Sequence, residues 1–411
     1  MIEHIGRHNG RWDFELKGDA LAIGGRTVTQ IAAELGSTPF YLYSSAAIRH
    51  RAEEVRRLLP QGADLHYAIK ANPMPEVVKL LGAVVNGFDV ASAGELAIAA
   101  ATSMPRRQIS FAGPGKRDSE LETAARADCI VNLESVNEMR RLHAIGASLG
   151  LKPATAVRVN PDFELKSSGM KMSGGPKPFG VDAAQVPALL TEMRATCLDF
   201  QGFHIFSGSQ NLRADAIMEA QSRALDLAMS LAPAAPRAPL FVNLGGGFGI
   251  PYFPGEQPLA TASIGTHLHS LVAIARHALP GTRLVLELGR YLVGEAGLYV
   301  CRVIDKKLSG GQIFLVTDGG MHHHLAASGN FGQVLRKNYP VVVCDRVFTG
   351  PREVASIVGP LCTPLDLLAD RMELASAEPG DLIAVLQSGA YGYTASPTRF
   401  LSHPEPQQLL V

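Results

Sequence analysis

Cysteine is scarce in this chain and shows no metal-binding arrangement. The five cysteines are Cys129, Cys197, Cys301, Cys344 and Cys362. They are scattered, odd in number and contain no Cys-x-x-Cys pair. This pattern argues against a disulfide framework and against a structural zinc site, and it favours a reducing compartment.

The chain also lacks an excess of charge of either sign and lacks long apolar segments. Lys and Arg together number 38, as do Asp and Glu, so no basic field is available for nucleic acid or an anionic membrane. The first residues, Met1–His8, are polar and contain no signal-peptide core, and no apolar run is long enough to span a bilayer. We therefore expect a cytoplasmic protein that binds neither nucleic acid nor a membrane.

What the chain does contain is typical of a compact folded protein. Hydrophobic residues make up 46% of the sequence and charged residues 18%. A length of 411 residues suggests two domains and suffices to bury a substantial core.

Eight short apolar runs recur in the middle of the chain and indicate strands. They are Leu65–Lys70, Gly87–Ser92, Gln108–Gly113, Asp128–Leu133, Ala154–Asn160, Phe200–Ser207, Leu240–Gly246 and Arg283–Leu288. The runs are nearly continuous rather than alternating, as in a parallel sheet covered on both faces, and helix-like stretches separate them. Eight such units predict a (β/α)8 barrel, also called a TIM barrel, with an open doubly wound sheet as the alternative.

The pattern changes after residue 290. Short strand-like runs separated by turns replace the helical periodicity and predict a mostly antiparallel C-terminal β domain. Within it, Asp305–Gly311 and Ala369–Gly380 are expected to be ordinary loops. The first forty or so residues also resemble β and turn material. We expect an N-terminal segment (1–43) that packs with the β domain, a barrel (44–290) and the β domain itself (291–411).

Polar residues end several of the predicted barrel strands, and active sites of such barrels lie at the carboxyl ends of the strands. Lys70 ends the first run, directly before Asn72-Pro73. In a mostly apolar site, the pKa of a lysine falls and its free amine becomes a nucleophile for a carbonyl group. A surface lysine is the alternative for Lys70 taken alone.

Three successive glycines, Gly245–Gly247, follow the seventh strand. Glycines allow the backbone to turn tightly and to present N–H groups to an anion, and barrels often bind phosphate at this place. The hydroxyl of Ser209 could bind the same phosphate. A dinucleotide fingerprint fits poorly because its third glycine is missing, and a merely tight loop is the other alternative.

Glu287 ends the eighth strand, where a buried carboxylate needs a cationic partner. The partner could be Arg290, or it could be a pyridinium nitrogen that the carboxylate keeps protonated. The adjacent histidines His322–His324 suggest a metal site. Neighbours in a strand point to opposite faces and rarely bind one ion, so we expect no metal.

Six motifs together identify a family. They are Tyr67-Ala68-Ile69-Lys70-Ala71-Asn72, Phe88-Asp89-Val90-Ala91-Ser92-Ala93-Gly94-Glu95-Leu96, Gly245-Gly246-Gly247-Phe248, Glu287-Leu288-Gly289-Arg290-Tyr291, Gly359-Pro360-Leu361-Cys362 and Gly389-Ala390-Tyr391. In this order the chain resembles the fold type III decarboxylases that depend on pyridoxal 5′-phosphate (PLP), which share the alanine racemase-like fold. The diaminopimelate, ornithine and arginine decarboxylases belong to this family.

The resemblance implies a role for each matching residue. Lys70 would hold PLP as a Schiff base, and Cys362 would reach in from a partner subunit and protonate the α-carbon after CO2 leaves. A homodimer with shared active sites is therefore implied. The implied cofactor-binding residues are Lys70, Asp89, His204, Phe206, Ser209, Gly245, Gly246, Gly247, Glu287, Gly289, Arg290 and Tyr391.

Three departures from the family pattern concern the substrate. Phe206 stands where the amino acid decarboxylases have a histidine that stacks on the PLP ring, and His204 lies two residues earlier on the same strand face. Thr363 follows Cys362 where the family usually has an acidic residue that binds the distal amino group of the substrate. His322–His324 and Asn330-Phe331-Gly332 replace the Arg-Pro segment that diaminopimelate decarboxylases have after the Asp-Gly-Gly turn. Together the departures disfavour a substrate with a free distal ammonium.

The segment Asn160–Met172 and the sequence Cys362-Thr363-Pro364 resemble one subgroup of the family more closely. Some of its members decarboxylate an aminoacyl group on a carrier protein, and others are associated with exosortase systems. We therefore predict a PLP-dependent decarboxylase of an amino acid or of a carrier-tethered aminoacyl group. The alternatives are a diaminopimelate decarboxylase, a catalytically silent decarboxylase-like regulator and an amino acid racemase on a related barrel.

Overall fold

The computed structural model describes residues 8, 10, 14–163, 170–171, 175–331, 333 and 336–411. Two compact units make up the chain. The barrel unit consists of Ala52–Gly249 and Leu259–Gly289, and the β unit consists of Met1–Arg51, Ile250–Pro258 and Arg290–Val411. Three separate segments of the chain thus make up the β unit. The predicted division into residues 1–43, 44–290 and 291–411 stays a prediction.

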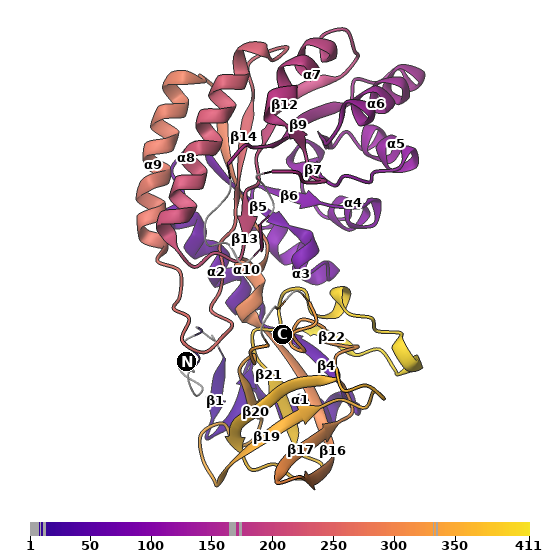
Figure 1. Cartoon of the computed structure of the whole chain (residues 1–411), viewed down its shortest axis with the longest axis vertical. Coiled ribbons are helices and arrows are strands. Elements are labelled where there is room, and N and C mark those ends of the chain that lie inside the picture. The colour runs from indigo at the N-terminus through magenta and orange to yellow at the C-terminus, as the bar shows by residue number, and fades with distance from the viewer. Residues whose placement is uncertain are drawn as a thin grey trace. The chain divides into compact units, whose positions relative to one another are not determined.

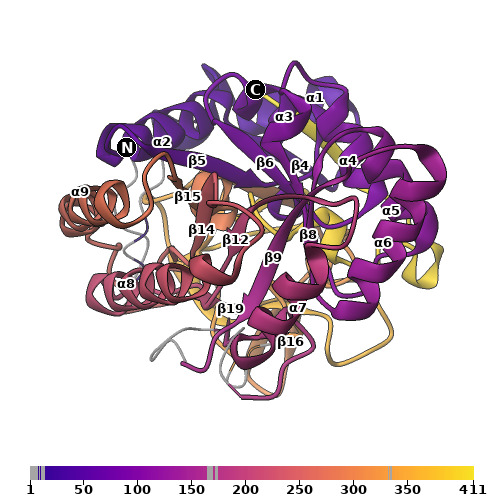
Figure 2. The ribbon, with the colours of Figure 1, turned by 90° about the horizontal axis from the view of Figure 1, so that it is seen from above.

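Eight parallel strands close into a barrel in the barrel unit (Figure 2). They are β5 (Ala63–Ala68), β6 (Gly87–Val90), β7 (Ile109–Phe111), β8 (Ile130–Leu133), β9 (Ala154–Asn160), β12 (Asp199–His204), β14 (Phe241–Gly246) and β15 (Arg283–Leu288). Pairing of β15 with β5 and of β8 with β9 completes the ring. The barrel prediction is confirmed, and the open doubly wound alternative is wrong.

Helices surround these strands on the outside (Figures 1 and 2). They are α3 (Pro75–Gly82), α4 (Ala93–Ala100), α5 (Asp118–Arg126), α6 (Val136–Leu149), α7 (Val186–Met193), α8 (Ala214–Leu231) and α9 (Thr261–Ala278). Local sequence sets their ends: the hydroxyls of Ser92 and Ser135 accept the N–H groups of Glu95 and Glu138 and cap α4 and α6. Within the described residues, no helix is both long and apolar enough to cross a membrane.

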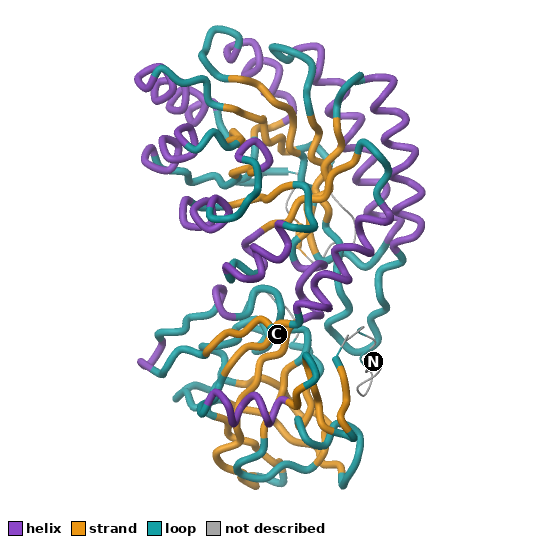
Figure 3. The backbone as a smooth tube through the Cα atoms, turned by 180° about the vertical axis from the view of Figure 1, so that it is seen from behind, coloured by secondary structure: helices purple, strands orange, loops and turns teal. Residues whose placement is uncertain are grey.

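Strands dominate the β unit (Figure 3). They are β1 (Glu15–Lys17), β2 (Ala20–Ile23), β3 (Arg26–Thr27), β4 (Phe40–Tyr43), β16 (Gly297–Ser309), β17 (Gln312–Thr317), β18 (Val341–Val343), β19 (Arg352–Val358), β20 (Leu367–Ala375), β21 (Leu382–Val385) and β22 (Gln407–Leu410). Most pairs are antiparallel, as predicted, and the parallel pairs are β17 with β19 and β22 with β4. The N-terminal β4 pairs with β16 of the same unit.

One strand of the β unit appears where the sequence indicated a loop. Residues 369–380 were predicted as an ordinary loop, but Leu367–Ala375 form β20 against β19. Asp370, Arg371 and Glu373 hide the strand in the sequence because they interrupt its apolar residues. A strand with one partly exposed face carries such charges without cost, so apolar continuity alone misses it. The predicted loop at 305–311 is likewise mostly the end of β16.

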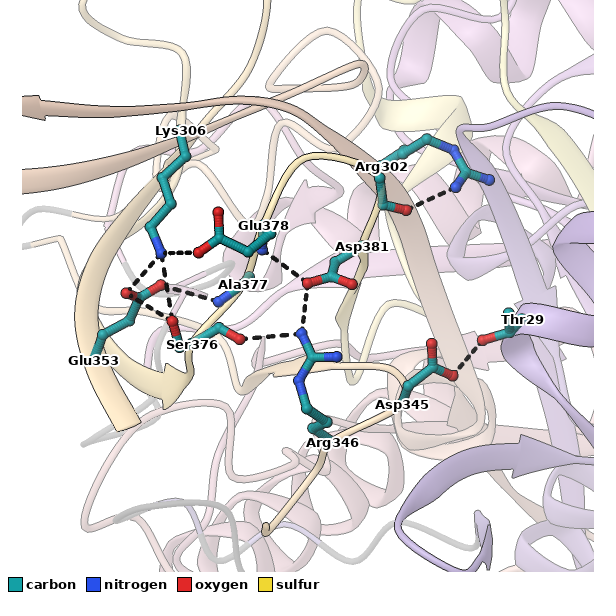
Figure 4. Close-up of polar contacts among 11 residues, drawn as sticks. Thr29, Arg302, Lys306, Asp345, Arg346, Glu353, Ser376, Ala377, Glu378 and Asp381 are labelled. Atoms are coloured by element: carbon teal, nitrogen blue, oxygen red, sulfur yellow. Dashed lines mark hydrogen bonds and ion pairs between the residues drawn. The ribbon is translucent and has the colours of Figure 1, made fainter. Parts of the chain in front are cut away.

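Ion pairs tie the far ends of these strands together (Figure 4). The Lys306 ammonium contacts the carboxylates of Glu353 at 3.0 Å and Glu378 at 2.9 Å, and Arg346 pairs with Asp381. Each cation thus has an acidic partner, and the carboxylates also accept backbone N–H groups, as Glu353 does from Ala377. We interpret this cluster as structural: it fixes the strand ends rather than forming a binding site.

Candidate active site

Lys70 lies just beyond the carboxyl end of β5, in the short 3-10 helix η1 (Ile69–Ala71). The Tyr67 hydroxyl donates to the Asn72 carbonyl at 2.9 Å and braces the turn around the lysine. The Lys70 side chain is exposed, and its ammonium lies 5.9 Å from the ring centroid of Phe206. The lysine at the strand end is therefore accessible to a carbonyl compound.

Glu287 ends β15 and is buried beside two polar side chains. His204 Nε2 lies 3.0 Å from Glu287 Oε2, and Asn243 Nδ2 donates to the same oxygen at 3.3 Å. Burial alone would raise the pKa of Glu287, but His204 and the positive charges of Lys70 and Arg158 lower it to about 2. The carboxylate is therefore ionised and can stabilise a cation placed against it.

Asp89, on β6, is a second buried carboxylate near this end of the barrel. Its register partner on β5 is Ala68, two residues before Lys70. Its Oδ2 lies 3.3 Å from Nδ1 of His66, which is also buried. Burial and the nearby charge of Glu287 raise the pKa of Asp89, and His66 opposes that rise.

The glycines Gly245–Gly247 pack too closely against their neighbours for any side chain. Gly245 and Gly247 have φ of +69° and +73°, and a Cβ on Gly246 would lie 2.1 Å from the Glu287 carbonyl oxygen. A Cβ on Gly247 would lie 2.7 Å from the carbonyl oxygen of Gly208, the neighbour of Ser209 in β13 (Gly208–Ser209). These close contacts and φ values explain why glycines stand here, and phosphate binding by the run stays a prediction.

The β unit holds Arg290 among tyrosines. Arg290 begins α10 (Arg290–Val293), donates to the Tyr252 hydroxyl at 2.8 Å and lies 4.7 Å from the ring centroid of Tyr391. Burial lowers the pKa of Arg290, but the surrounding tyrosines raise it by more. The net pKa lies above its usual value, so the guanidinium stays charged. Arg290 and Tyr391 thus contact each other, whereas the described partners of Glu287 are His204 and Asn243.

Cys362 is exposed in a loop of the β unit that one buried carboxylate organises. Asp366 accepts the N–H groups of Leu361 at 2.8 Å and Met321 at 2.6 Å, and it is 3% exposed. The loop geometry around Cys362 therefore depends on Asp366, whose oxygens are occupied by the backbone.

His322–His324 lie in a turn, so the strand geometry used to argue against a metal was wrong. All three side chains are buried, and burial lowers the pKa of His322 to about 3, His323 to about 4 and His324 to about 3. His323 Nε2 lies 2.9 Å from the Pro404 carbonyl oxygen, and His324 Nε2 lies 2.9 Å from the Ser388 hydroxyl. Across the described residues, no group of three or more His, Cys, Asp or Glu side chains is arranged to hold a metal.

The predicted site residues divide between the two units. The barrel unit contains Lys70, Asp89, His204, Phe206, Ser209, Gly245, Gly246, Gly247, Glu287 and Gly289, and the β unit contains Arg290, Cys362 and Tyr391. Residues 164–169 and 172 of the subgroup-like segment lie outside the described residues.

Sequence reasoning missed three side chains of these clusters: His66, Asn243 and Tyr252. Alternation along β5 could have indicated His66, because residues 66, 68 and 70 fall on one side of an ideal strand. Asn243 stands two residues before the glycines Gly245–Gly247 and was indicated more weakly by the sequence. No sequence pattern pointed to Tyr252.

The family model described as the pyridoxal-binding domain of pyridoxal-dependent decarboxylases matches residues 45–294, more than half of the chain. The chain belongs to this family. It is therefore a PLP-dependent decarboxylase with the type III fold, as the six motifs predicted.

Relatives and a solved structure match along nearly the whole chain. The L-glutamyl-[BtrI acyl-carrier protein] decarboxylase of Niallia circulans is 38% identical over 380 residues, covering 91% of this chain and 88% of that protein. The diaminopimelate decarboxylase of Aquifex aeolicus is 32% identical over 400 residues, covering 97% of this chain and 92% of that protein. The crystal structure of M. jannaschii diaminopimelate decarboxylase with L-lysine has a TM-score of 0.87 and 26% identity, covering 97% of this chain and 92% of that chain.

The described residues of the barrel unit fit PLP. The ionised, buried Glu287 suits a protonated pyridine nitrogen. The glycine run at the end of β14 has no side chains to cover its backbone, as a phosphate loop requires, and the Gly245 N–H donates to Asn243 Oδ1 at 2.8 Å. Lys70 offers an exposed amine at the end of β5, the strand that pairs with β15.

Proposed function

We propose that this decarboxylase acts on an amino acid carried by an acyl carrier protein, a glutamyl group foremost. The relative named as a carrier-protein glutamyl decarboxylase supports this substrate, at 38% identity over 91% of the chain. Such a substrate has its distal end covalently occupied. It therefore needs no carboxylate in the enzyme to bind a free distal ammonium.

The loop around Cys362 supports the same proposal. Thr363 follows the cysteine, and Asp366 is the carboxylate in the segment 359–366. Asp366 is buried and accepts two backbone N–H groups, so it is poorly placed to bind an ammonium as well. A loop without an available carboxylate favours a substrate without a distal positive charge.

We assign the proposed roles residue by residue. Lys70 binds the cofactor carbonyl, and Glu287, oriented by His204 and Asn243, holds the proton on the pyridine nitrogen. Bound PLP supplies the electron sink for the bonding pair that remains when CO2 leaves. Cys362 delivers the proton to the α-carbon.

The phosphate group needs donors without competing side chains. We propose that Gly245–Gly247 and Gly289 bring backbone close to it, that Ser209 adds a hydroxyl, and that Arg290 and Tyr391 supply charge and a second hydroxyl. Phe206 is proposed to pack on the ring face in place of a histidine, with Asp89 nearby.

We further propose that the enzyme is a cytoplasmic homodimer in which Cys362 serves the partner's Lys70 site. The exposure of Cys362 in the single chain supports a contact made across subunits. Exposed apolar side chains close to it in sequence, such as Leu365 at 54%, support burial by a second copy.

A CO2-release assay tests the proposal. Purified enzyme with PLP is given glutamyl-carrier protein, free glutamate, lysine and diaminopimelate in parallel, with Lys70→Ala as the inactive control. We expect release from the carrier-bound substrate at least ~100-fold above release from the free amino acids. Turnover of diaminopimelate at the higher rate would instead make the chain a diaminopimelate decarboxylase.

A separate measurement distinguishes a silent regulator. The wild type should bind PLP with an absorbance band that disappears in Lys70→Ala, because the amine forms the covalent link. A protein that shows this band but releases no CO2 from any substrate would be a regulator that only binds the cofactor.

A further inference from the structure

A second buried histidine–carboxylate pair lies inside the barrel, and its histidine has no role in the function described so far. His66 Nδ1 on β5 lies 3.3 Å from Asp89 Oδ2 on β6, and both side chains are buried. Both Asp89 carboxylate oxygens lack a well-aligned hydrogen-bond donor among the described residues. Buried carboxylates are rarely left so, which indicates that water or a ligand reaches this pair.

The sequence makes room for His66 at one position. A Cβ on Gly87 would lie 2.4 Å from His66 Nε2, so the imidazole occupies the space that a side chain at residue 87 would take. Gly87 is also the register partner of His66 on β6. The histidine and the glycine therefore form a matched pair, and the ring orientation that faces Asp89 is fixed by packing.

His66 and Asp89 line a cavity of about 260 Å³ inside the barrel. Its polar lining includes Asp64, His66, Asp89, Ser110, Gln201 and Asn243. Barrel interiors are normally filled by side chains, whereas this cavity has room for several water molecules. Apolar side chains also line it (Ile130, Leu240, Phe241 and Val285), and we call the space the chamber.

The chamber opens at the amino-terminal ends of the strands. Leu240, which precedes β14, is 47% exposed, and Arg283, which begins β15, has a half-exposed side chain. Both residues line the cavity. Lys70 follows the opposite, carboxyl end of β5. Asp89 thus stands between a solvent-connected chamber and the end of the barrel that carries Lys70.

Charged and titratable groups face His66 from its own strand and its neighbours. They are Asp64, Asp89, His204, Arg283, Glu287 and Arg107. Burial lowers the pKa of His66, but the carboxylates of Asp89, Asp64 and Glu287 raise it more, so the net direction is upward. Arg283 pairs with Asp64 at the chamber mouth, which leaves Asp89 as the carboxylate in contact with the imidazole.

We propose that His66 is a positioning residue for Asp89, and that the chamber is a passage through which this pair exchanges protons with solvent at the amino-terminal end of the barrel. Decarboxylation consumes one proton for each CO2 released, as R–COO⁻ plus H⁺ gives R–H plus CO2. A passage at the far end supplies protons to the barrel interior while substrate occupies the Lys70 end. The inference depends on the decarboxylase family and not on the identity of the substrate.

Histidine NMR on the holoenzyme tests the pairing. In ¹⁵N-histidine-labelled protein with PLP, the signal lost in His66→Asn identifies His66. We expect its titration midpoint to lie above that of a free histidine side chain and to move to lower pH in Asp89→Asn. The exposed His269 on α9 serves as the internal control and should keep its midpoint in that variant. A His66 midpoint that Asp89→Asn leaves unchanged, or one below a free histidine, would overturn the pairing.

A variant that fills part of the chamber tests whether protons reach His66 through it. Val285 lines the cavity, so Val285→Phe fills part of it, whereas Ile274→Phe on exposed α9 is the matched control. We expect exchange of the His66 ring N–H with D2O to slow at least tenfold in Val285→Phe and to keep the wild-type rate in Ile274→Phe. Equal exchange in both variants would show that protons reach His66 by another route.

His66→Asn should also shift the pH dependence of the PLP absorbance band, and a structural role alone would leave that band unmoved.

Discussion

At the scale of single residues, Glu287 is the side chain whose charge the proposed function needs most. Its carboxylate is buried, and its pKa is lowered to about 2 by His204 and the positive charges nearby. Glu287→Gln keeps the shape and removes the charge. We expect kcat to fall ~100-fold because the pyridine nitrogen loses its anionic partner.

The control for this variant is Glu192→Gln on α7, which removes an exposed carboxylate that pairs with Arg140. It should leave kcat and KM at wild-type values. Steady-state kinetics of both variants provides the measurement, together with the position of the PLP absorbance band. A kcat within twofold of wild type for Glu287→Gln would contradict the assigned role.

His324 sets a second prediction, about stability against pH. Its pKa is lowered by burial to about 3 in the folded chain, and a free histidine titrates near 6.5. Below pH 6.5 the unfolded state binds a proton that the folded state does not bind, so stability is lost as pH falls toward 3. Between pH 7 and 5 this one group should cost about 2 kcal/mol.

The measurement is urea unfolding of the wild type and His324→Gln at pH 7 and pH 5. The loss of stability between the two pH values should be smaller in the variant by about 2 kcal/mol. The exposed His269→Gln on α9 should show the wild-type pH dependence. Parallel pH profiles for wild type and His324→Gln would contradict the prediction, because they would show that His324 takes up a proton as readily in the folded state as in the unfolded state.

The site residues differ in how far they could be predicted from the sequence. Lys70 and Glu287 could be predicted because they stand at strand ends inside recognisable motifs. His66 could not, because a single histidine in an apolar run is as often a packed core residue. Its proposed role depends on Gly87, 21 positions along the chain, which leaves space for the ring.

At the scale of elements, a buried ion pair joins α6 to the loop before α5. Lys116 and Glu138 are 1% and 3% exposed in their side chains and lie 2.7 Å apart, and the ammonium also donates to two backbone carbonyls. Lys116→Met leaves Glu138 buried without its partner. We expect the free energy of unfolding to fall by ~3–5 kcal/mol.

Two further variants make this prediction specific. Lys116→Met combined with Glu138→Leu removes both charges and should recover most of the lost stability, because no unpaired carboxylate remains. Arg140→Met breaks the exposed pair with Glu192 and should leave the unfolding midpoint nearly unchanged. Urea unfolding at neutral pH measures all three. Equal losses for Lys116→Met and Arg140→Met would contradict the importance of burial.

The elements themselves were largely predictable where burial dictates composition. The eight barrel strands are covered on both faces, so their apolar runs marked them in the sequence, and β9 and β15 have the predicted bounds. The strand β20 was missed because its partly exposed face carries charges that resemble a loop. The turn of His322–His324 was missed because tertiary contacts, not a local pattern, hold those rings.

At the scale of the whole molecule, the proposed site residues come from segments far apart in the sequence. Those of the barrel unit extend from Lys70 to Gly289, and those of the β unit from Arg290 to Tyr391. A boundary between units falls between Gly289 and Arg290, which are neighbours in one motif. The chain therefore changes unit inside a motif that we propose binds the cofactor.

The proposed homodimer predicts complementation between two inactive variants. Lys70→Ala removes the amine that binds the cofactor, and Cys362→Ser removes the thiol that delivers the proton. If Cys362 acts in the partner's site, a mixed dimer contains one site with both defects and one site with neither. When equal amounts of the two variants exchange subunits, half of the dimers are mixed, and activity should return to about one quarter of the wild-type value. The measurement is CO2 release after the variants are dissociated and reassociated together, with each variant treated alone as the control. If Lys70 and Cys362 instead acted within one chain, every site would keep one defect and the mixture would stay inactive.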